Sequence, residues 1–474
     1  MIKGLRKYIL FAGMMSVISL AVMAKDDWIL VNSRQEKDVV ALPVRIASLD
    51  SLRYNAVDAD TINEIEMFFK DGSRTTVDVR KFVSMGIFPD VTDVYIDTDP
   101  YVDTISSKEV YLEGYFRFTP HDGTDTIVQQ VSIKGRGNSS WEWHAKKSYR
   151  LKFDKKQSVP GLNKAKSFVL IANYIDNTLL KNVVAYKTAE LLQLPYSNPS
   201  IPVNFIFNGK NWGSYIMTNK VGINSGSVDI DEKRGVLWEL DTYFDEDFRF
   251  QSTAYQLPCM IKDPDFTEIT DGSEEEIERV WEFWKTDLDS ALNLVKEGRW
   301  TDVFDRDQFV KYILVNHVMG NSELAYPKSF YMYKEEAGEK YKMGPVWDFD
   351  YALGYTWKAG HPLLWQNEDT PGYSFFKDIF GSEEFMAAFE TEFEKFKIDI
   401  LPQLLEFIDC KAEEIRVSAA KDAEIWPAKH ETDWEELDEI NLNNCDDHIL
   451  KLKRFITDRV EYISNSPNYL LYEE

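Results

Sequence analysis

The chain has 474 residues, of which 44% are hydrophobic and 14% aromatic, so it can bury a sizeable core in two or three domains. Acidic residues outnumber basic ones by 80 to 54, which gives a formal net charge of −26. This charge repels nucleic acid and anionic membranes and favours cationic partners or divalent ions, although solubility alone can also explain it. The three cysteines allow at most one disulfide and offer no zinc site.

Residues 1–24 have the layout of a cleavable secretory signal peptide. Lys3, Arg6 and Lys7 precede an apolar run over 8–22, and small residues end at Ala24, the expected cleavage site. The alternative is a membrane anchor, but this run is shorter than the ~20 residues that span a bilayer. We therefore expect export to the periplasm, the cell surface or the medium, with no membrane span in the mature chain.

An N-terminal β-rich region is expected over residues 25–130. Short β-branched or aromatic runs, separated by turn residues such as Asp71-Gly72, predict antiparallel strands there. The predicted strands cover 65–69, 77–79, 91–96, 109–118 and 126–133. We expect this region to support the rest of the chain.

A second β-rich part is expected over residues 131–265. Gly135-Arg136-Gly137 is typical of a small-residue turn, and alternation predicts a strand over 148–153 with Arg150 and Lys152 on its polar face. A helix is expected over 176–194. Further strands are expected over 168–172, 202–207, 212–218 and 235–240.

Residues 266–465 are expected to be mostly helical. Ser273 with Glu276, and Asp305 with Gln308, have the spacing of capping boxes and predict two helix starts. One hairpin, over 329–334 and 340–347, interrupts this part. The predicted fold class is α+β, with a β-rich lobe followed by a helical lobe.

Candidate chemistry gathers around that hairpin. A loop with Glu323 and, five residues later, Lys328 precedes it, and Asp348-Phe349-Asp350 follows it. Protein kinases carry a catalytic acid, a metal or phosphate ligand and a magnesium-binding aspartate in this order. A carboxylate held rigidly at a strand end suits a metal ion, so Asp348 is the candidate ligand. The simpler interpretation of Asp348 is a turn residue, because aspartate is common at strand ends.

Five segments, taken together and in this order, resemble the spore-coat-protein-H-like (CotH) kinase family. They are KGRGNSSW at 134–141, KKSYRLKF at 146–153, ANYIDNTLLKN at 172–182, GVLWELD at 235–241 and GPVWDFD at 344–350. The resemblance covers roughly residues 90–460. It implies an atypical protein-kinase-like fold that uses ATP and Mg²⁺ or Mn²⁺ to transfer phosphate to Ser or Thr hydroxyls of a protein substrate.

The resemblance also implies roles for individual residues. Asp348 is similar to the family's metal-binding aspartate, and Asp350 is its companion. Glu239 and Asp241 are expected to line the nucleotide cleft, or else to form an acid pair at a hairpin edge. The basic residues expected at the phosphates, with Lys152 as the first candidate, are Arg136, Lys147, Arg150 and Lys152.

Two positions depart from the family's pattern. The catalytic loop of better-known members carries Asp and then Asn, where this chain has Glu323 and Lys328. Glutamate can still act as a general base with altered geometry. Lysine cannot bind a cation, but it can neutralise a phosphate directly. The sequence thus leaves open an active one-metal kinase and a pseudokinase that serves as a binding or scaffold protein.

The alternatives have their own candidate residues. Trp357, Trp365 and Tyr373 would suit a surface that binds a glycan or a protein, or they pack a long loop against the core. A hydrolase using the paired carboxylates Glu323 and Asp348 is a third possibility, but it explains neither the glycine turn nor the basic strand. No histidine pair has metal-binding spacing. His317 is expected to be a core residue or one that supports a site from behind, and not a catalyst.

Overall fold

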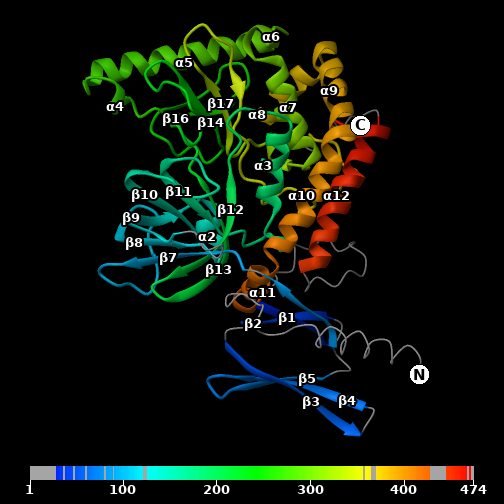
Figure 1. The fold of residues 1–474 in the computed structure, drawn as a ribbon. Helices are drawn as coiled ribbons and strands as arrows, with labels where there is room; N and C mark the ends of the chain where they lie inside the picture. The colour runs from blue at the N-terminus through cyan, green and yellow to red at the C-terminus, as the bar shows by residue number, and fades with distance from the viewer. Residues whose placement is uncertain are drawn as a thin grey trace.

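The computed structural model describes residues 28–470 of the chain, apart from 36–37, 46–47, 59–60, 79–81, 89, 121–124, 356–357, 365–369, 428–444 and 467–468. The expected signal peptide lies outside these residues. Within them, no helix combines the length and the apolar character needed to cross a bilayer. Figure 1 shows two small sheets at one end, a barrel in the middle and the main helical part at the other end.

Two three-stranded antiparallel sheets begin the described chain. One has the order β2-β1-β6 and the other the order β3-β4-β5. Ile29, Ile65 and Met67 belong to one small core that these sheets share, so the antiparallel β region that the sequence predicts is confirmed. The strands are β1 (Trp28–Gln35), β2 (Asp38–Arg45), β3 (Leu49–Asp58), β4 (Thr61–Phe69), β5 (Arg74–Asp78) and β6 (Phe82–Phe88).

A closed seven-stranded barrel follows, with the order β10-β11-β13-β12-β7-β8-β9. Every neighbouring pair is antiparallel except β7 with β12, which is parallel. Aromatic side chains such as Phe116, Phe153 and Phe168 fill its interior. The strands are β7 (Thr92–Thr98), β8 (Leu112–Thr119), β9 (Ile127–Arg136), β10 (Ser148–Gln157), β11 (Ala165–Ile171), β12 (Ser200–Phe207) and β13 (Lys210–Asn219).

The barrel corrects the domain boundary expected between residues 130 and 131. That point falls inside β9, and β7 and β8 lie before it although they complete the barrel. The pairing of β7 with β12 joins segments more than a hundred residues apart, for example Asp93 with Asn204. Residue alternation within a strand is the same in a barrel as in an open sheet, so no local pattern could show this closure.

A five-stranded sheet with the order β15-β16-β14-β17-β18 packs against the helical part. Leu240 of β14 lies opposite Phe330 of β17, so strands expected in separate lobes form one sheet, and the lobe boundary expected at 265–266 is wrong. The predicted hairpin is present, but its second strand has only two residues. The strands are β14 (Val236–Leu240), β15 (Arg249–Gln251), β16 (Pro258–Asp263), β17 (Phe330–Lys334) and β18 (Lys342–Met343).

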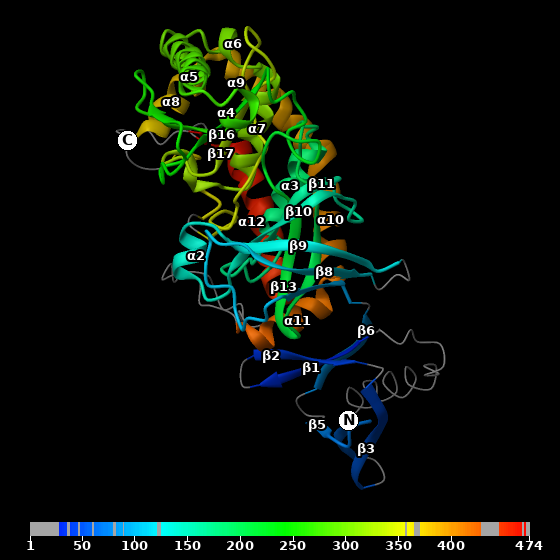
Figure 2. The same cartoon turned by 90° about the vertical axis from the view of Figure 1, so that its left-hand side faces the viewer.

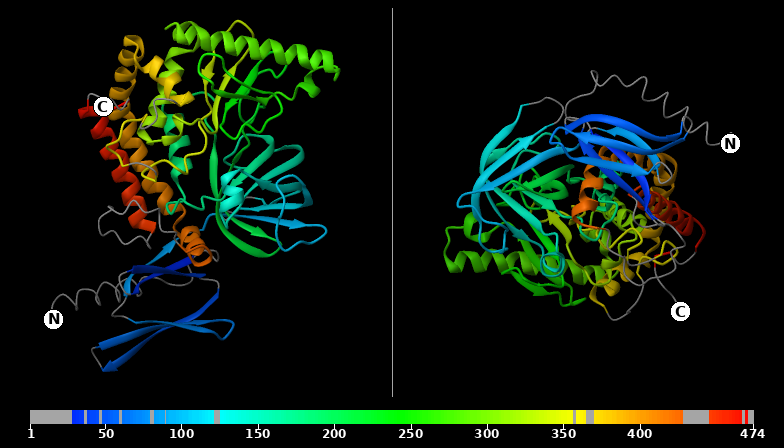
Figure 3. Two further views of the ribbon diagram at one scale, coloured as in Figure 1. Left: turned by 180° about the vertical axis from the view of Figure 1, so that it is seen from behind. Right: turned by 90° about the horizontal axis from the view of Figure 1, so that it is seen from below.

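Helices cover this sheet and one side of the barrel. The Ser273 hydroxyl accepts from the Glu276 amide and the Asp305 carboxylate from the Gln308 amide, which confirms both predicted helix starts. Figure 3 shows α10 and α12 side by side. The helices are α2 (Ser139–Trp143), α3 (Lys181–Leu191), α4 (Phe266–Ile269), α5 (Glu274–Lys296), α6 (Trp300–Val303), α7 (Arg306–Val318), α8 (Pro371–Phe380), α9 (Glu383–Lys395), α10 (Leu401–Glu414), α11 (Arg416–Ile425) and α12 (Cys445–Asn465).

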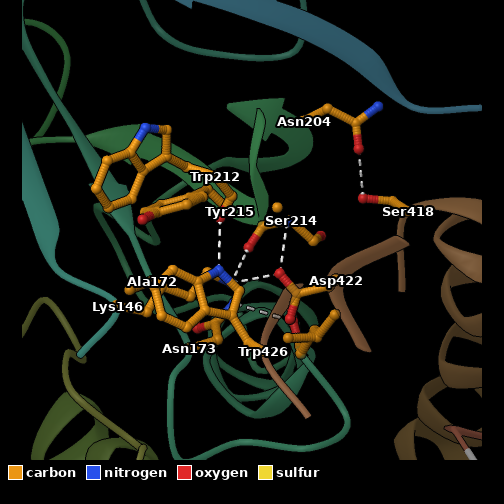
Figure 4. Close-up of polar contacts among 12 residues, drawn as sticks. Lys146, Ala172, Asn173, Asn204, Trp212, Ser214, Tyr215, Ser418, Asp422 and Trp426 are labelled. Atoms are coloured by element: carbon orange, nitrogen blue, oxygen red, sulfur yellow. Dashed lines mark hydrogen bonds and ion pairs between the residues drawn. The ribbon is translucent and has the colours of Figure 1, made fainter. Parts of the chain in front are cut away.

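Helix α11 is bound to the barrel by buried polar contacts, which Figure 4 shows. The Lys146 ammonium donates to the Asp422 carboxylate at 2.7 Å and to the Ser214 carbonyl at 2.5 Å. The Asp422 carboxylate also accepts from the Ser214 amide at 2.7 Å. Gly213 makes room for this contact, since a Cβ there would lie 2.2 Å from an Asp422 oxygen. The helical part and the barrel are therefore joined through charge as well as apolar packing.

The same helix also contacts the first N-terminal sheet. Leu30 of β1 packs with Val417 and Ala420 of α11, and the Lys421 ammonium lies 3.8 Å from the centre of the Trp28 ring. Figure 2 shows α11 between the barrel and strands β1 and β2. One short helix thus touches both β-rich parts of the molecule.

Candidate functional site

A cleft of about 430 Å³ opens between the barrel and the five-stranded sheet. The barrel contributes the outward faces of its strands: Val169 packs with the helical core, whereas its neighbour Phe168 packs inside the barrel. The opposite wall comes from β14, β16 and the loops around β17 and β18. The volume lies within the ~300–1,000 Å³ that pockets for small molecules usually have.

The barrel wall of the cleft is basic. Lys134 and Arg136 come from β9, Arg150 from β10, and Lys220 directly follows β13. Arg150 lies opposite Lys134 in the register, so both side chains leave the barrel on the same face. Among the residues that the structure describes, none of these four cations forms an ion pair with a carboxylate. The wall therefore carries positive charge that the protein does not neutralise at close range.

Two of these cations, Lys220 and Arg150, are affected by burial in the wall of the cleft. Burial, followed by the nearby charges of Arg150 and Lys262, lowers the pKa of Lys220 to about 8. The Arg150 Nε atom is buried with no hydrogen-bond partner in the described chain. A buried donor without an acceptor costs free energy until an acceptor arrives. An anion bound in the cleft would satisfy both groups.

Two of the basic residues expected at the phosphates lie elsewhere. Lys152 is exposed and lies opposite Ser132, one step further along β10 from the pair that faces the cleft. Lys147 donates to the Trp141 carbonyl and lies over the Trp141 ring. Neither lines the cleft. Arg150, two residues earlier on the same face of β10, lines the cleft.

The glycine segment differs from the small-residue turn that the sequence predicts. Gly135 and Arg136 complete β9, and the turn begins only at Gly137, which has a φ of 96°. A Cβ on Gly135 would lie 2.1 Å from the Trp141 ring, so this glycine allows Trp141 to pack flat on the strand. The close packing brings α2 to the edge of the cleft.

The facing wall is acidic. Glu239 lies in β14 and Asp241 directly follows it, and both line the cleft as expected. The Glu239 carboxylate accepts from the Tyr331 hydroxyl and from the Lys262 ammonium, both at 2.7 Å. Although burial opposes it, the carboxylates of Glu239 and Glu246 raise the pKa of Lys262. Glu239 therefore already has a cation, unlike Asp348 deeper in the cleft.

Asp241 uses its carboxylate to hold the backbone. One oxygen accepts from the Tyr243 amide at 2.8 Å and the other from the Ser329 amide at 3.0 Å. Burial raises the pKa of this group to about 7. These contacts tie the end of β14 to the start of β17 and so position the loop that carries Lys328.

Asp348 and Asp350 lie at the bottom of the cleft. Asp348 has a φ of 61°, a left-handed conformation that non-glycine residues adopt rarely and that is concentrated at functional sites. Within the described residues its carboxylate accepts no hydrogen bond. Burial raises its pKa, while Arg136 and Lys328 act in the opposite direction. The Asp348 carboxylate is thus free to bind a cation.

Helix α3 holds this aspartate segment in place. The Asn182 side chain accepts from the Phe349 amide at 2.9 Å and donates to the Asp350 carboxylate at 2.5 Å. Ahead of α3, the Asp176 carboxylate accepts from the Thr178 and Lys181 amides. These bonds hold the segment before Lys181 in a turn, and α3 begins at residue 181 and not near residue 176. Burial, followed by the charge of Asp348, raises the pKa of Asp350 to about 7.

Glu323 and Lys328 complete the lower part of the cleft. Glu323 lies in a short 3₁₀ turn, η2 (Ser322–Leu324), which the Asn321 side chain caps. The Lys328 ammonium lies 3.9 Å from the Glu323 carboxylate. Burial and then the charge of Asp348 raise the pKa of Glu323, whereas Lys328 lowers it. The structure thus brings together Glu323, Lys328 and Asp348, as the order in the sequence predicts.

The donor set at this site bears on which ion it could hold. In the described ranges, no group of three or more His, Cys, Asp or Glu side chains is arranged as a metal site. Mg²⁺ keeps several waters and is commonly bound by one or two carboxylates together with substrate phosphates. Asp348 with one neighbouring carboxylate fits this mode, whereas zinc or calcium would need more protein ligands.

Several residues of the cleft were given no role from the sequence, among them Lys134, Asn182, Lys220 and Lys262. Lys134 and Asn182 lie in segments that resemble the family, but the sequence assigned them no role. Lys220 follows a predicted strand, where lysine is common, so no signal marked it out. Only the fold brings these residues to one place.

Two other expectations concern residues outside the cleft. His317 is fully buried, and Arg459 donates to its carbonyl at 2.8 Å, so its expected place in the core is confirmed. Tyr373 is only 3% exposed and packs in the core, so it does not supply a binding surface. Trp357 and Trp365 lie outside the described residues.

Comparison with known proteins identifies the family. A family model described as CotH kinase protein matches residues 133–463, well over half of the chain. The chain belongs to the CotH kinase family. Among solved structures, one titled "Crystal structure of the golgi casein kinase" is similar over 81% of this chain and 77% of its own, with 7% identity and a TM-score of 0.25. No curated protein matches the chain.

The CotH kinase match includes the acidic wall, the aspartate segment and the basic wall. It begins within β9, so the barrel strands β7 and β8 lie before the matched residues. Each of the four cations on the barrel wall falls inside the match. The kinase-like character of the chain therefore rests on the part that forms the cleft.

Proposed function

We propose that the chain is an ATP-dependent protein kinase that transfers the γ-phosphate to a Ser or Thr hydroxyl with the help of one divalent ion. The observation that carries this proposal is the division of charge across the cleft. Four cations without carboxylate partners face a set of carboxylates that includes the unpartnered Asp348. A nucleoside triphosphate with its metal ion needs both kinds of wall at once.

The basic wall would bind the phosphates. Arg136 lies close enough to Asp348 to oppose the rise in that group's pKa, so it would contact the phosphate nearest the metal. Arg150 and Lys220 would bind the rest of the chain of phosphates. An arginine guanidinium can bind two phosphate oxygens at once, and lysine acts as a point charge.

The acidic wall would hold the metal and the acceptor. Asp348 would bind Mg²⁺ or Mn²⁺, and Asp350 would assist it through the backbone that Asn182 fixes. A bound divalent ion neutralises charge that develops between the phosphates. Glu323 would accept the proton of the acceptor hydroxyl. Lys328, whose ammonium lies 3.9 Å from the Glu323 carboxylate, would neutralise the γ-phosphate.

A second candidate function is a pseudokinase that binds nucleotide or a protein partner without transfer. The contact between Lys328 and Glu323 favours it, since a paired carboxylate is a weaker base than a free one. This candidate retains the cleft and the binding of nucleotide. It differs from the kinase only in whether phosphate reaches an acceptor.

Nucleotide binding and transfer test these proposals separately. We expect ATP with Mg²⁺ or Mn²⁺ to raise the melting temperature of the mature protein, and Asp348→Ala to abolish the rise. Asp307→Ala, which changes an exposed aspartate on α7, is the matched control and should bind as the original protein does. Absence of any nucleotide-induced shift under all metal conditions would refute both candidates.

Transfer of labelled phosphate then decides between the two candidates. The kinase predicts labelling of the protein itself or of a partner, with loss of labelling but not of ATP binding in Glu323→Gln. The pseudokinase predicts binding without labelling in the original protein. Glu323→Asp, which has the acid of better-known family members, is an informative further variant because it shortens the side chain by one methylene.

Export is also part of the proposal. The charged, then apolar, then small-residue layout of residues 1–24 supports cleavage after Ala24 and action in the periplasm, at the cell surface or in the medium. The partners would be ATP and a protein acceptor, with a glycan or surface protein as an alternative for the pseudokinase. Mass spectrometry of the protein purified from the cell envelope and the medium would show whether the chain begins at Lys25.

A further inference from the structure

Tyr186 has a hydroxyl that the structure leaves unused beside the proposed metal site. The residue lies on α3, lines the cleft and is only 2% exposed. Its ring stacks on Trp347, with ring centres 5.8 Å apart and planes 20° apart. Among the described residues, its hydroxyl oxygen has no hydrogen-bond partner. Buried hydroxyls are normally hydrogen-bonded, so this exception requires an explanation.

The nearest explanation is the aspartate that follows Trp347. The carboxylate of Asp348 accepts no hydrogen bond within the described chain, so a donor and an acceptor both lie unpaired in one region. Trp347, on which the Tyr186 ring stacks, directly precedes Asp348, and Tyr186, Asp348 and Asp350 all line the cleft. Asp350 already accepts from Asn182. Asp348 is therefore the carboxylate that still needs a partner.

Helix geometry supports the same pairing. Tyr186 follows Asn182 by four residues, so both side chains lie on one face of α3, about one turn apart. Asn182 uses that face to bind the Phe349 amide and the Asp350 carboxylate. Tyr186 presents the second donor of the same face, next to the left-handed backbone of Asp348. One face of α3 thus lies against both aspartates of the segment, Asp348 and Asp350.

We propose that Tyr186 is a positioning residue of the metal site, whose hydroxyl donates to one Asp348 oxygen while the other oxygen binds the divalent ion. This inference rests on the proposed function, because it takes Asp348 as the metal ligand. Hydrogen bonds to a ligating carboxylate fix its orientation, and their loss typically weakens metal binding 10–100-fold. Within the described residues, neither the hydroxyl nor the Asp348 carboxylate has another hydrogen-bond partner that would compete with this bond.

Tyr186→Phe tests the inference, because it removes only the hydroxyl and keeps the ring on Trp347. We expect Mn²⁺ to bind 10–100-fold more weakly, as measured by electron paramagnetic resonance of free Mn²⁺ during a titration. We also expect the metal-free variant to melt at the same temperature as the original protein or higher, because a buried unpaired hydroxyl is removed. Weaker Mn²⁺ binding together with an equal or higher melting temperature is expected of a positioning residue, and not of a residue that only stabilises the fold.

Tyr341→Phe is the matched control. Tyr341 is fully buried and donates to the Asp287 carboxylate at 2.7 Å, outside the cleft. Its variant should melt at a lower temperature without metal and bind Mn²⁺ as the original protein does. If Tyr186→Phe behaves like this control, Tyr186 is a purely structural residue and the inference is wrong. If the original protein binds no Mn²⁺ at all, the proposed metal-dependent function fails and the inference with it.

Discussion

The Lys146 ammonium lies 2.7 Å from the Asp422 carboxylate, although the two residues are 276 positions apart in the chain. Lys146 is 1% exposed, so its charge is removed from water and needs this partner. Burial lowers the pKa of Lys146 and raises that of Asp422, while each charge shifts the other's pKa in the opposite direction. The pair binds α11 to the barrel just before strand β10, which carries Arg150 into the cleft.

Lys146→Met should destabilise the protein by about 3–5 kcal/mol, because it leaves Asp422 buried without its cation. The measurement is the free energy of unfolding from urea denaturation. Lys146→Met combined with Asp422→Leu should recover much of the loss, since an apolar pair of similar volume replaces the ionic one. Lys152→Met, which changes an exposed lysine of β10, is the control. A loss below about 1 kcal/mol would show that the pair contributes little.

Arg150→Ala should weaken ATP binding by about 10–100-fold, because hydrogen bonds to charged groups contribute roughly 1.5–3 kcal/mol. Lys152→Ala should leave binding unchanged, since its side chain is exposed and lies outside the cleft. Isothermal titration calorimetry with ATP and Mg²⁺ compares the two variants directly. If Lys152→Ala weakened ATP binding more than Arg150→Ala did, the expectation from the sequence that Lys152 binds the phosphates would be favoured.

ATP affinity should fall as the pH rises from 7 to 9, since Lys220 loses its proton around a pKa of about 8. One pH unit above that value, the loss is at most about tenfold. Lys220→Met should bind ATP more weakly at pH 7 and show a flatter pH dependence. A variant with the same pH dependence as the original protein would assign the effect to another group.

Without nucleotide, the free energy of unfolding should instead rise with pH between the folded and the unfolded pKa of Lys220. Folding depresses the pKa of Lys220 from 10.5 to about 8, so between these values the unfolded chain binds more protons. The contribution of Lys220 to the free energy of unfolding therefore rises with pH through this window, and its cost is fully present below about pH 8. Urea denaturation at pH 7.5 and 9.5 should show a larger gain for the original protein than for Lys220→Met.

Gly135→Ala should destabilise the protein by about 1–3 kcal/mol, because the new methyl group would overlap the Trp141 ring at 2.1 Å. Gly381→Ala is the control: its φ is −71°, and the added Cβ would lie at an ordinary 3.4 Å from the Lys377 carbonyl. That change should be neutral or slightly stabilising. Thermal melting of both variants measures the contrast, and equal melting temperatures would show that Trp141 moves aside freely.

Local patterns predicted the features that depend on neighbouring residues. The caps at Ser273 and Asp305 are where the sequence places them, and Asn208 and Gly209 have the positive φ angles of a turn between the strands predicted over 202–207 and 212–218. These features follow from hydrogen bonds and steric limits within four residues. Glu323, Lys328 and Asp348 line one cleft, but their expected association came from their order along the chain and not from a local pattern.

Features that depend on distant pairing could not be predicted in this way. Alternation in residues 148–153 identified the polar face of β10, but it could not show that Arg150 faces the cleft while Lys152 lies beyond its edge. Asn182 binds Phe349 across 167 positions, and no local pattern encodes that contact. The pairing of β7 with β12, which closes the barrel, likewise joins distant residues that no local pattern connects.

Helix α11 also bears on the order in which the molecule can form. The barrel uses strands from residue 92 to residue 219, yet the counterion of its buried Lys146 is Asp422. During synthesis from the amino terminus, this lysine would remain without its partner until most of the helical part had emerged. A fragment that ends before α11 should therefore stay open at this edge and be sensitive to proteases. Resistance of the barrel to cellular proteases would therefore depend on synthesis of the chain through α11.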